Sequence, residues 1–258
     1  MRSIHIALLS AMPEEIGTTL EHLENTTCSE YGDLKVHTGE WKELRDNCVS
    51  VFISIAWSGW GKVSAARAIT RLISNADNSM PINLVLFTGV AGAADLILNQ
   101  WDVIVPDEVM QYDMDARPLF KQFLIPALNK DKLKASIDWT DWIYKSLTKA
   151  KNNSLLDEFG KINKGLIATG DTFISDRNIL KRLSKSIPKL SAVEMEGAAV
   201  AQVCSQEGIP WTIVRVISDN ANDSAAESFN TFIKKYKNYS WKLIRSILIE
   251  YKNAPVIK

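Results

Sequence analysis

The sequence predicts an α/β fold in which a buried sheet is flanked by helices. Short, strongly apolar and β-branched runs, typical of buried strands, alternate along the chain with longer segments of helical periodicity. Turns of small residues follow several of these strands, as they do where strands and helices pack closely. The 258 residues, 46% of them hydrophobic, suffice for one large α/β core. We therefore predict a single domain over residues 1–258.

Composition and charge narrow the class of protein. The 30 basic and 30 acidic residues leave no net charge, which argues against a broad surface for nucleic acid. Cys28, Cys48 and Cys204 are far apart and lack CxxC spacing, so a reduced setting fits better than a disulfide framework or a zinc site. The N-terminal apolar run is too short for a signal peptide, and no segment reaches the ~18 apolar residues of a membrane span. We expect a cytoplasmic protein with no membrane or nucleic-acid partner.

The first helix is predicted from the residues that follow the first strand. An apolar run over 4–9 leads into Pro13, Glu14 and Glu15. Proline and glutamate are favoured in the first turn of a helix, and we expect this helix to continue through Leu23. On this pattern alone, both glutamates can simply complement the helix dipole.

The other strands and helices are predicted from two patterns of apolar residues. Strands have short apolar and β-branched runs, whereas helices have apolar residues at helical spacing. Residues 129–163 are polar and lysine-rich, and we interpret them as an insertion within the one domain. The predicted strands are 34–41 and 48–57, which form a hairpin, then 82–87, 101–105, 164–168 and 211–217. The predicted helices are 63–73, 139–147, 176–185, 197–205 and 228–252.

Three turns of small residues follow strands, and each has two interpretations. Residues 58–62 can offer free N–H groups to an anion, but SGWGK matches neither usual phosphate-binding motif, and a tight packing turn explains it equally well. Residues 88–94 leave room for a flat ligand, or for close packing. Phe173 and Ile174, which follow the turn at 169–171, either stack on a planar ring or belong to the core.

Residues 107–120 form a polar and aromatic segment that contains Asp113, Asp115 and Arg117. Carboxylates can bind a metal ion, but no histidine or further ligand follows at useful spacing. We therefore interpret this segment as a solvated or interface loop.

Residues 191–222 contain most of the candidate functional carboxylates of the chain. Glu194 and Glu196 precede a predicted helix, and a predicted buried strand ends at Asp219. Glu15 also lies just beyond a strand end. Ligands of open α/β sheets bind at the carboxyl ends of the strands, so these carboxylates lie where chemistry is expected.

Carboxylates, rather than histidines, are the candidate catalytic groups. His5, His22 and His37 do not lie at the strand ends, which disfavours a histidine triad or a metallohydrolase. Two carboxylic groups suit glycosidic cleavage, in which one protonates the leaving group and the other activates water. If the leaving group is a nitrogen heterocycle, burial would raise the pKa of Asp219 and so allow it to donate the proton.

Six motifs resemble, in the same order, those of the purine nucleoside phosphorylase/hydrolase superfamily. They are IALLSAMPEEI, SGWGKVSAARA, FTGVAGAAD, GLIATGDTFI, VEMEGAAVAQVC and VRVISDNAN. The chain looks most like the 5′-methylthioadenosine/S-adenosylhomocysteine nucleosidases, from Ile4 to about Phe229. The most specific part of this resemblance is the combination of the VEMEGAA and SD motifs. The resemblance implies a single three-layer α/β/α domain with a central mixed, partly barrel-like sheet flanked by helices.

The resemblance also implies roles for the catalytic and sugar-binding residues. Glu15 would activate the attacking water, and Asp219, oriented by Ser218, would protonate N7 of adenine. Glu196 would hold the ribose hydroxyls, with Met195 packed under the sugar.

The remaining binding residues form the base site and its walls. By the same resemblance, Phe173 would stack on the base, and the backbone of Ile174 would contact the adenine edge. Gly92 would lie in the wall of the site, and Phe229 would close over the substrate.

The resemblance favours hydrolysis over phosphorolysis. Phosphorylases of this superfamily carry an arginine just before the glycine turn, where this chain has Phe87, and the Glu15 carboxylate would repel phosphate. The chain departs from the nucleosidases at Pro13, where they have glutamate, and at Val90, where they have serine. The predicted function is therefore hydrolysis of the N-glycosidic bond of 5′-methylthioadenosine or S-adenosylhomocysteine, with release of adenine.

Two other functions stay open. The chain can be a phosphorylase or a hydrolase of another purine nucleoside, or a catalytically silent nucleoside-binding or storage protein. In each case the partner is a small-molecule nucleoside, and we predict neither a cofactor nor a metal. The resemblance implies a homodimer whose partner subunit closes the 5′ pocket, for which Trp101, Tyr112, Leu119 and Phe120 are candidate interface residues.

Overall fold

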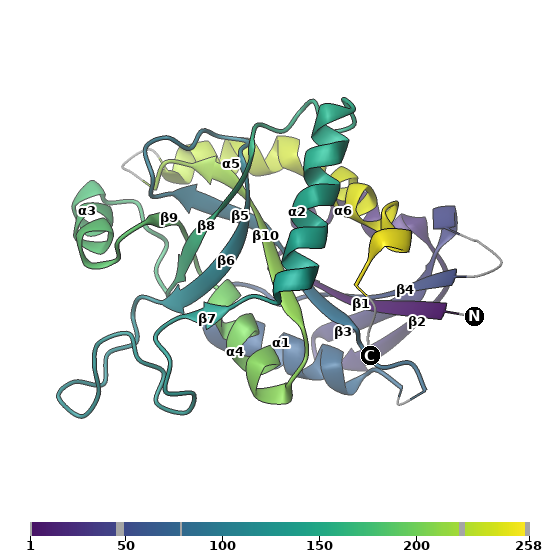
Figure 1. The fold of residues 1–258 in the computed structure, drawn as a ribbon, viewed down its shortest axis with the longest axis horizontal. Coiled ribbons are helices and arrows are strands. Elements are labelled where there is room, and N and C mark those ends of the chain that lie inside the picture. Colours follow the sequence, from purple (N-terminus) through teal and green to yellow (C-terminus); the bar gives the residue numbers. More distant parts are fainter. Residues whose placement is uncertain (1, 45–48, 78, 222–224, 256–258) are drawn as a thin grey trace.

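The computed structural model describes residues 2–44, 49–77, 79–221 and 225–255, which fold around one mixed sheet (Figure 1). Its strands follow the order β10-β6-β8-β9-β5-β1-β4-β3-β2, and β7 pairs with β6. The strands are β1 Arg2–Ser10, β2 Leu23–Tyr31, β3 Leu34–Trp41, β4 Val49–Trp57, β5 Leu84–Ala93, β6 Val103–Gln111, β7 Leu133–Lys134, β8 Ile162–Thr169, β9 Leu190–Glu194 and β10 Trp211–Asp219.

One half of the sheet closes on itself. β5 pairs in parallel with β10 and antiparallel with β9, while β10 pairs with β6, and β8 lies between β6 and β9. The path β5-β10-β6-β8-β9 therefore returns to β5 as a five-stranded, barrel-like closure. From it, β1, β4, β3 and β2 extend as an open sheet. The predicted mixed, partly barrel-like sheet is confirmed.

Helices cover both faces of the sheet, which confirms the three layers (Figure 1). Along β1, Ile4, Ile6 and Leu8 point into the core beneath α2, α5 and α6, whereas Ala7 and Leu9 point into the core beneath α1 and α4. This alternation explains why the strand is apolar at nearly every position. Among the described helices, none offers the length of apolar chain that a bilayer-crossing segment requires. The helices are α1 Lys62–Ser74, α2 Ile137–Asn152, α3 Arg177–Ser186, α4 Gly197–Glu207, α5 Ala225–Tyr236 and α6 Ser240–Leu248.

The predicted helix over 13–23 is wrong. The chain makes two 3-10 turns, Pro13–Glu15 and Gly17–His22, and then enters β2, a strand that the sequence did not predict. Gly17 breaks the helix because its φ is +52°. Its backbone also packs closely on the rest of the chain, since a Cβ there would lie 2.4 Å from the carbonyl oxygen of Lys237.

Two predicted strands, 82–87 and 101–105, differ most in their bounds from the strands of the structure. β5 continues to Ala93 instead of ending at Phe87, so residues 88–93 are extended chain rather than a turn. They can stay extended because β10 and β9 pair with this part of β5. β6 begins at Val103, later than predicted, and runs to Gln111.

The predicted C-terminal helix over 228–252 is two helices. α5 ends at Tyr236 and α6 begins at Ser240, with a turn between them. Both helices keep their apolar faces on the same core, so the helical pattern passes through the break without showing it. Cys48, the first residue of the predicted strand 48–57, and Asn222, the last residue of the stretch 191–222, lie outside the described residues.

Candidate active site

The predicted site residues line one pocket at the carboxyl ends of the strands. Its empty volume is about 570 Å³. Glu15 comes from the turn after β1, Glu196 from the link between β9 and α4, and Asp219 from the end of β10. The other predicted residues that line it are Gly92, Phe173, Ile174, Met195, Ser218 and Phe229. Glu194, which the sequence also placed among the candidate carboxylates, lines it too. Residues to which sequence analysis gave no individual role complete the lining: Ala11, Met12, Trp60, Val90, Ala91, Thr172, Val193 and Ala221.

Glu15 is buried and held by backbone donors. Its Oε2 accepts hydrogen bonds from the N–H groups of Ala11, at 2.7 Å, and Met12, at 3.0 Å, while its Oε1 accepts one from Val90 at 3.0 Å. Burial raises the pKa of Glu15, and the Arg215 charge and the three N–H groups oppose that rise. The glutamate is thus fixed in position, with its pKa above the ordinary range.

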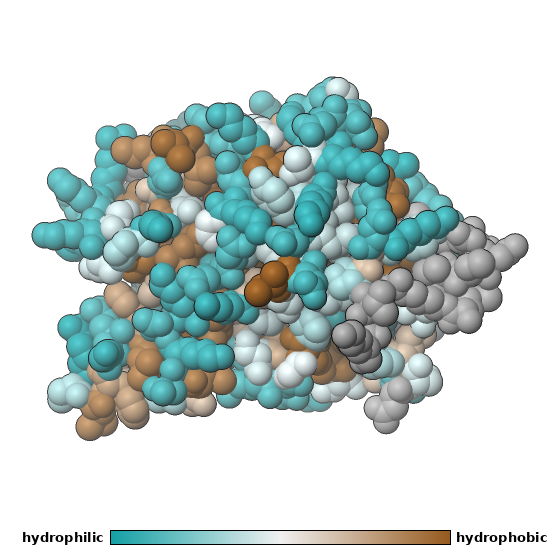
Figure 2. Space-filling view, in the orientation of Figure 1, coloured by the Kyte–Doolittle hydropathy of each residue, from teal (hydrophilic) through white to brown (hydrophobic). Residues whose placement is uncertain are grey.

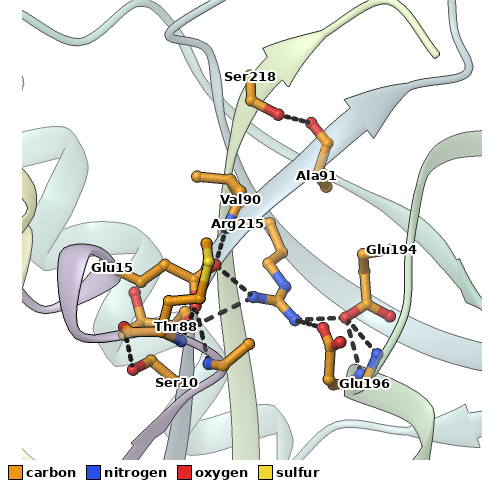
Figure 3. Close-up of polar contacts among 12 residues, drawn as sticks. Ser10, Glu15, Thr88, Val90, Ala91, Glu194, Glu196, Arg215 and Ser218 are labelled. Carbon is orange, nitrogen blue, oxygen red and sulfur yellow. Dashed lines mark hydrogen bonds and ion pairs between the residues drawn. The ribbon is translucent and has the colours of Figure 1, made fainter. Parts of the chain in front are cut away.

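Arg215 lies in the middle of β10 and joins three carboxylates (Figure 3). Its Nη1 is 3.7 Å from Oε1 of Glu15, and its Nη2 bonds Glu194 and lies 3.4 Å from Oε2 of Glu196. The guanidinium is fully buried and packs over the Phe87 ring, 4.1 Å from its centroid. Sequence analysis missed this residue, although an arginine within an otherwise apolar strand is a signal of a paired buried charge.

The Arg215 cluster includes two glutamates at the start of α4. Oε2 of Glu194 accepts the N–H groups of Glu196, at 3.1 Å, and Gly197, at 2.8 Å, where the helix dipole favours negative charge. Thr169 donates its hydroxyl to the other oxygen of Glu194. Burial, together with the neighbouring Glu194 charge, raises the pKa of Glu196 to about 8. Three carboxylates therefore share the one guanidinium of Arg215.

The turn at 58–62 binds carboxylates of the protein itself. The N–H of Gly61 donates to Oε1 of Glu196 at 2.8 Å, and the N–H of Lys62 donates to Oδ1 of Asp171 at 2.7 Å. These two donors are among those that a bound phosphate would use. Of the two interpretations of this turn, the structure supports a packing and positioning role.

Asp219 lines the pocket beside Gly92, and no charged side chain is among the described groups that shift its pKa. Its Oδ2 is 2.7 Å from the Ser218 hydroxyl, and its Oδ1 accepts the N–H of Ala221 at 2.8 Å. Burial raises the pKa of Asp219 above the ordinary range. Gly92 leaves room for this carboxyl, because a Cβ there would lie 3.0 Å from Oδ1.

Aromatic side chains form the outer wall of the pocket. The rings of Phe173 and Phe229 meet edge to face with their centroids 5.8 Å apart, and Trp60 meets Phe229 in the same way at 6.0 Å. Trp60 is 52% exposed, so its indole stands at the mouth. A wall of this kind suits a flat, largely apolar ligand.

The predicted interface residues differ in exposure. Leu119 and Phe120 are 83% and 44% exposed, and Figure 2 shows hydrophobic surface at the lower left, over the loops beyond β6. The hydroxyl of Tyr112 donates to the carbonyl of Thr172 at 3.2 Å. Trp101 is half-buried and also packs within the chain, 4.4 Å from the Phe232 ring centroid, and its place at an interface stays a prediction.

Comparisons with known proteins show the family and the fold of the chain. The sequence model of the Phosphorylase superfamily matches residues 5–249. A 5′-methylthioadenosine/S-adenosylhomocysteine nucleosidase of Bacillus pumilus is 31% identical over 93% of this chain and 96% of that protein. The nucleosidase of Colwellia psychrerythraea, solved in complex with adenine, has a TM-score of 0.85 and 28% identity over 99% of both chains. The futalosine hydrolase of Helicobacter pylori has a TM-score of 0.80 and 29% identity over 96% of this chain and 98% of that one.

Proposed function

Because the chain belongs to the Phosphorylase superfamily, we propose that it is a nucleosidase that hydrolyses 5′-methylthioadenosine and S-adenosylhomocysteine and releases adenine. The observation that carries this proposal is the pocket shared by Glu15, Glu196 and Asp219, which supplies a base, a diol ligand and an acid in one cleft. Relatives named for this hydrolysis cover most of the chain and support the same reaction.

Asp219 is the proposed acid. Cleavage of the N-glycosidic bond leaves negative charge on the purine unless a ring nitrogen is protonated as the bond breaks. Burial raises the pKa of Asp219, which favours its protonated form, and the Ser218 hydroxyl and Ala221 N–H fix the carboxyl's orientation. The proposed target is N7 of adenine, with the base held against Phe173.

Glu15 is the proposed base. Its carboxylate is held rigidly at the floor of the pocket, where it accepts three N–H groups and lies near Arg215. A water between this carboxylate and the sugar would lose its proton to Glu15 as it attacks C1′ of the ribose. The electrostatic field of Arg215 stabilises the ionised form of Glu15, which is the form that a base requires.

Glu196 is the proposed ligand of the ribose. One of its oxygens is tied to the N–H of Gly61 and the other faces Arg215, so the carboxylate is oriented before substrate arrives. In its ionised form, which the Arg215 charge and the N–H of Gly61 favour, Glu196 can accept both hydroxyls of a 2′,3′-diol. With the base at Asp219 and the diol at Glu196, the 5′ group is left against Met12, Trp60 and Phe229.

Water is the proposed nucleophile rather than phosphate. The described lining of the pocket includes four carboxylates and no lysine or arginine. Arg215 lies behind this wall and is already bonded to Glu194 and near two further carboxylates. A phosphate dianion would therefore meet net negative charge.

A homodimer in the cytoplasm is the proposed setting. Leu119 and Phe120 leave apolar area in water on a monomer, which a second copy of the chain would cover. In size-exclusion chromatography with light scattering, we expect twice the mass of the 28.9 kDa chain. A fully active species of monomer mass would contradict the dimer.

The test is to incubate the purified protein with 5′-methylthioadenosine, S-adenosylhomocysteine, adenosine and inosine, with and without phosphate. We expect adenine release from the first two at a rate independent of phosphate. Phosphate-dependent formation of a sugar 1-phosphate would instead identify a phosphorylase. Binding of adenosine analogues without release of any base would identify a silent binding protein.

A further inference from the structure

Helix α1 begins at the edge of the pocket without a capping side chain of its own. Its N-cap residue is Gly61, at φ +91°, which has no side chain to accept the first N–H groups of the helix. Two carboxylates from elsewhere in the chain replace it. Glu196 accepts the N–H of Gly61 at 2.8 Å, and Asp171 accepts that of Lys62 at 2.7 Å.

Asp171 also belongs to a closed ring of hydrogen bonds. Its own N–H donates to Oδ2 of Asp113 at 3.0 Å, and Oδ1 of Asp113 accepts Nζ of Lys62 at 2.6 Å. The backbone of Lys62 then returns to the Asp171 carboxylate. We call Lys62, Asp113 and Asp171 the three-residue ring. It joins the start of α1, the segment after β6 and the segment after β8.

The three-residue ring lies between the parts of the site that contact the base and the sugar. Asp171 directly precedes Thr172, Phe173 and Ile174, which line the pocket. Lys62 directly follows Gly61, whose N–H holds Glu196. The spacing is tight, because a Cβ on Gly61 would lie 3.1 Å from Oδ1 of Asp171.

We propose that Asp171 is a positioning residue that fixes residues 172–174, the base-contacting segment, relative to Glu196. This inference rests on the proposed function, because it takes the base to lie against that segment. Asp171 is exposed and touches no proposed reacting atom, so it acts through the backbone of its neighbours. Its charge at the start of α1 is favourable, and small displacements of binding groups have large effects on affinity.

The test is Asp171→Ala, read by steady-state kinetics and by calorimetric binding of free adenine. Loss of the acceptor frees the base-contacting segment from α1. We expect KM for 5′-methylthioadenosine and Kd for adenine to rise together by about tenfold, with kcat within about threefold. Asp171→Asn keeps an oxygen acceptor for the N–H of Lys62, so it should restore most of both affinities.

Asp176→Ala is the matched control. Asp176 lies on the same connection between β8 and α3, where its Oδ1 accepts the N–H of Asn178 at 2.7 Å and caps α3. Its loss should lower the thermal midpoint of unfolding and leave KM and adenine affinity unchanged. Equal losses of affinity in the Asp171 and Asp176 variants would overturn the inference, as would an Asp171→Ala variant with wild-type KM and adenine Kd.

Lys62→Met provides a second variant if Asp171→Ala does not fold. It removes one side of the ring and keeps the backbone N–H, so the same two constants should rise by a smaller factor. Wild-type constants in a folded Lys62→Met protein would overturn the inference. Failure of the proposed function is seen separately, as a wild-type protein that releases no adenine from any nucleoside.

Discussion

The two ends of the pocket hold carboxyl groups that burial affects alike but whose neighbours differ. Glu15 accepts three backbone N–H groups and has Arg215 at 3.7 Å, whereas Asp219 has one N–H and one hydroxyl. Burial raises the pKa of both. Only at Glu15 does a cation oppose the rise. The nearby cation therefore favours the ionised form of Glu15, whereas no cation does so at Asp219, and the predictions below test whether this difference divides the roles of base and acid.

The largest expected effect is that of Asp219→Asn. The amide keeps the shape of the carboxyl but cannot give a proton to the purine, so we expect kcat for 5′-methylthioadenosine to fall by about 10²–10⁴ with the fold intact. Adenine release is followed by absorbance, and folding by circular dichroism. Near-normal release by this variant would rule out Asp219 as the acid.

Glu15→Gln is the matched variant at the other end, and the leaving group separates the two roles. A p-nitrophenyl riboside departs without protonation, so Asp219→Asn should retain activity on it. Glu15→Gln should lose activity on this compound and on the nucleoside alike, because water must be activated in both. If both variants lose both activities equally, the division of roles is wrong.

Arg215→Met should have the largest effect on stability. It removes the cation from among three buried carboxylates, and breaking such a cluster costs about 3–5 kcal/mol in the free energy of unfolding. Urea denaturation measures this loss. Arg67→Met is the control, since Arg67 pairs with Asp33 on the surface and its loss should have a much smaller effect on stability. Similar losses in the two variants would show that the cluster does not depend on its cation.

The pH profile of kcat/KM should be bell-shaped because the two ends need opposite protonation states. Glu15 acts when ionised, so its raised pKa places the acid limb above the range of an ordinary glutamate. Asp219 acts when protonated, so its raised pKa carries activity to higher pH before the basic limb begins. With the p-nitrophenyl riboside only the acid limb should remain. A basic limb that persists with this compound would place the second titration on another group.

The same contrast shows what the sequence can reveal of this molecule. Glu15 and Asp219 follow strand ends, where the topology of an α/β sheet makes a ligand site, and the motifs specify which carboxylates to choose. Arg215 is harder to recognise, because it is a single charged residue in the middle of a largely apolar strand. The proposed role of Asp171 is harder still to predict from the sequence, because it depends on a hydrogen bond to Lys62, which lies 109 positions away along the chain.

The predicted helices and strands show a similar limit to what the sequence can reveal. Alternating apolar runs were enough for the α/β class and for most strands, because periodicity reports which faces are buried, whereas the three layers were implied by the family resemblance. The break at Gly17 depends instead on a contact with Lys237, and the extension of β5 through 88–93 depends on pairing with β10 and β9. Long-range contacts of this kind decide element ends, and local propensity does not record them.

The smallest expected effect concerns the mouth, where Trp60→Ala removes an indole that is half exposed and touches Phe229. Losing one partly buried aromatic contact costs about 1 kcal/mol, so KM for 5′-methylthioadenosine should rise about fivefold. Adenosine, whose 5′ hydroxyl makes less apolar contact, should change less. Val63→Ala is the control, because Val63 is 82% exposed and does not line the pocket. Equal changes for both nucleosides would mean that Trp60 shapes the whole cleft and does not read the 5′ group.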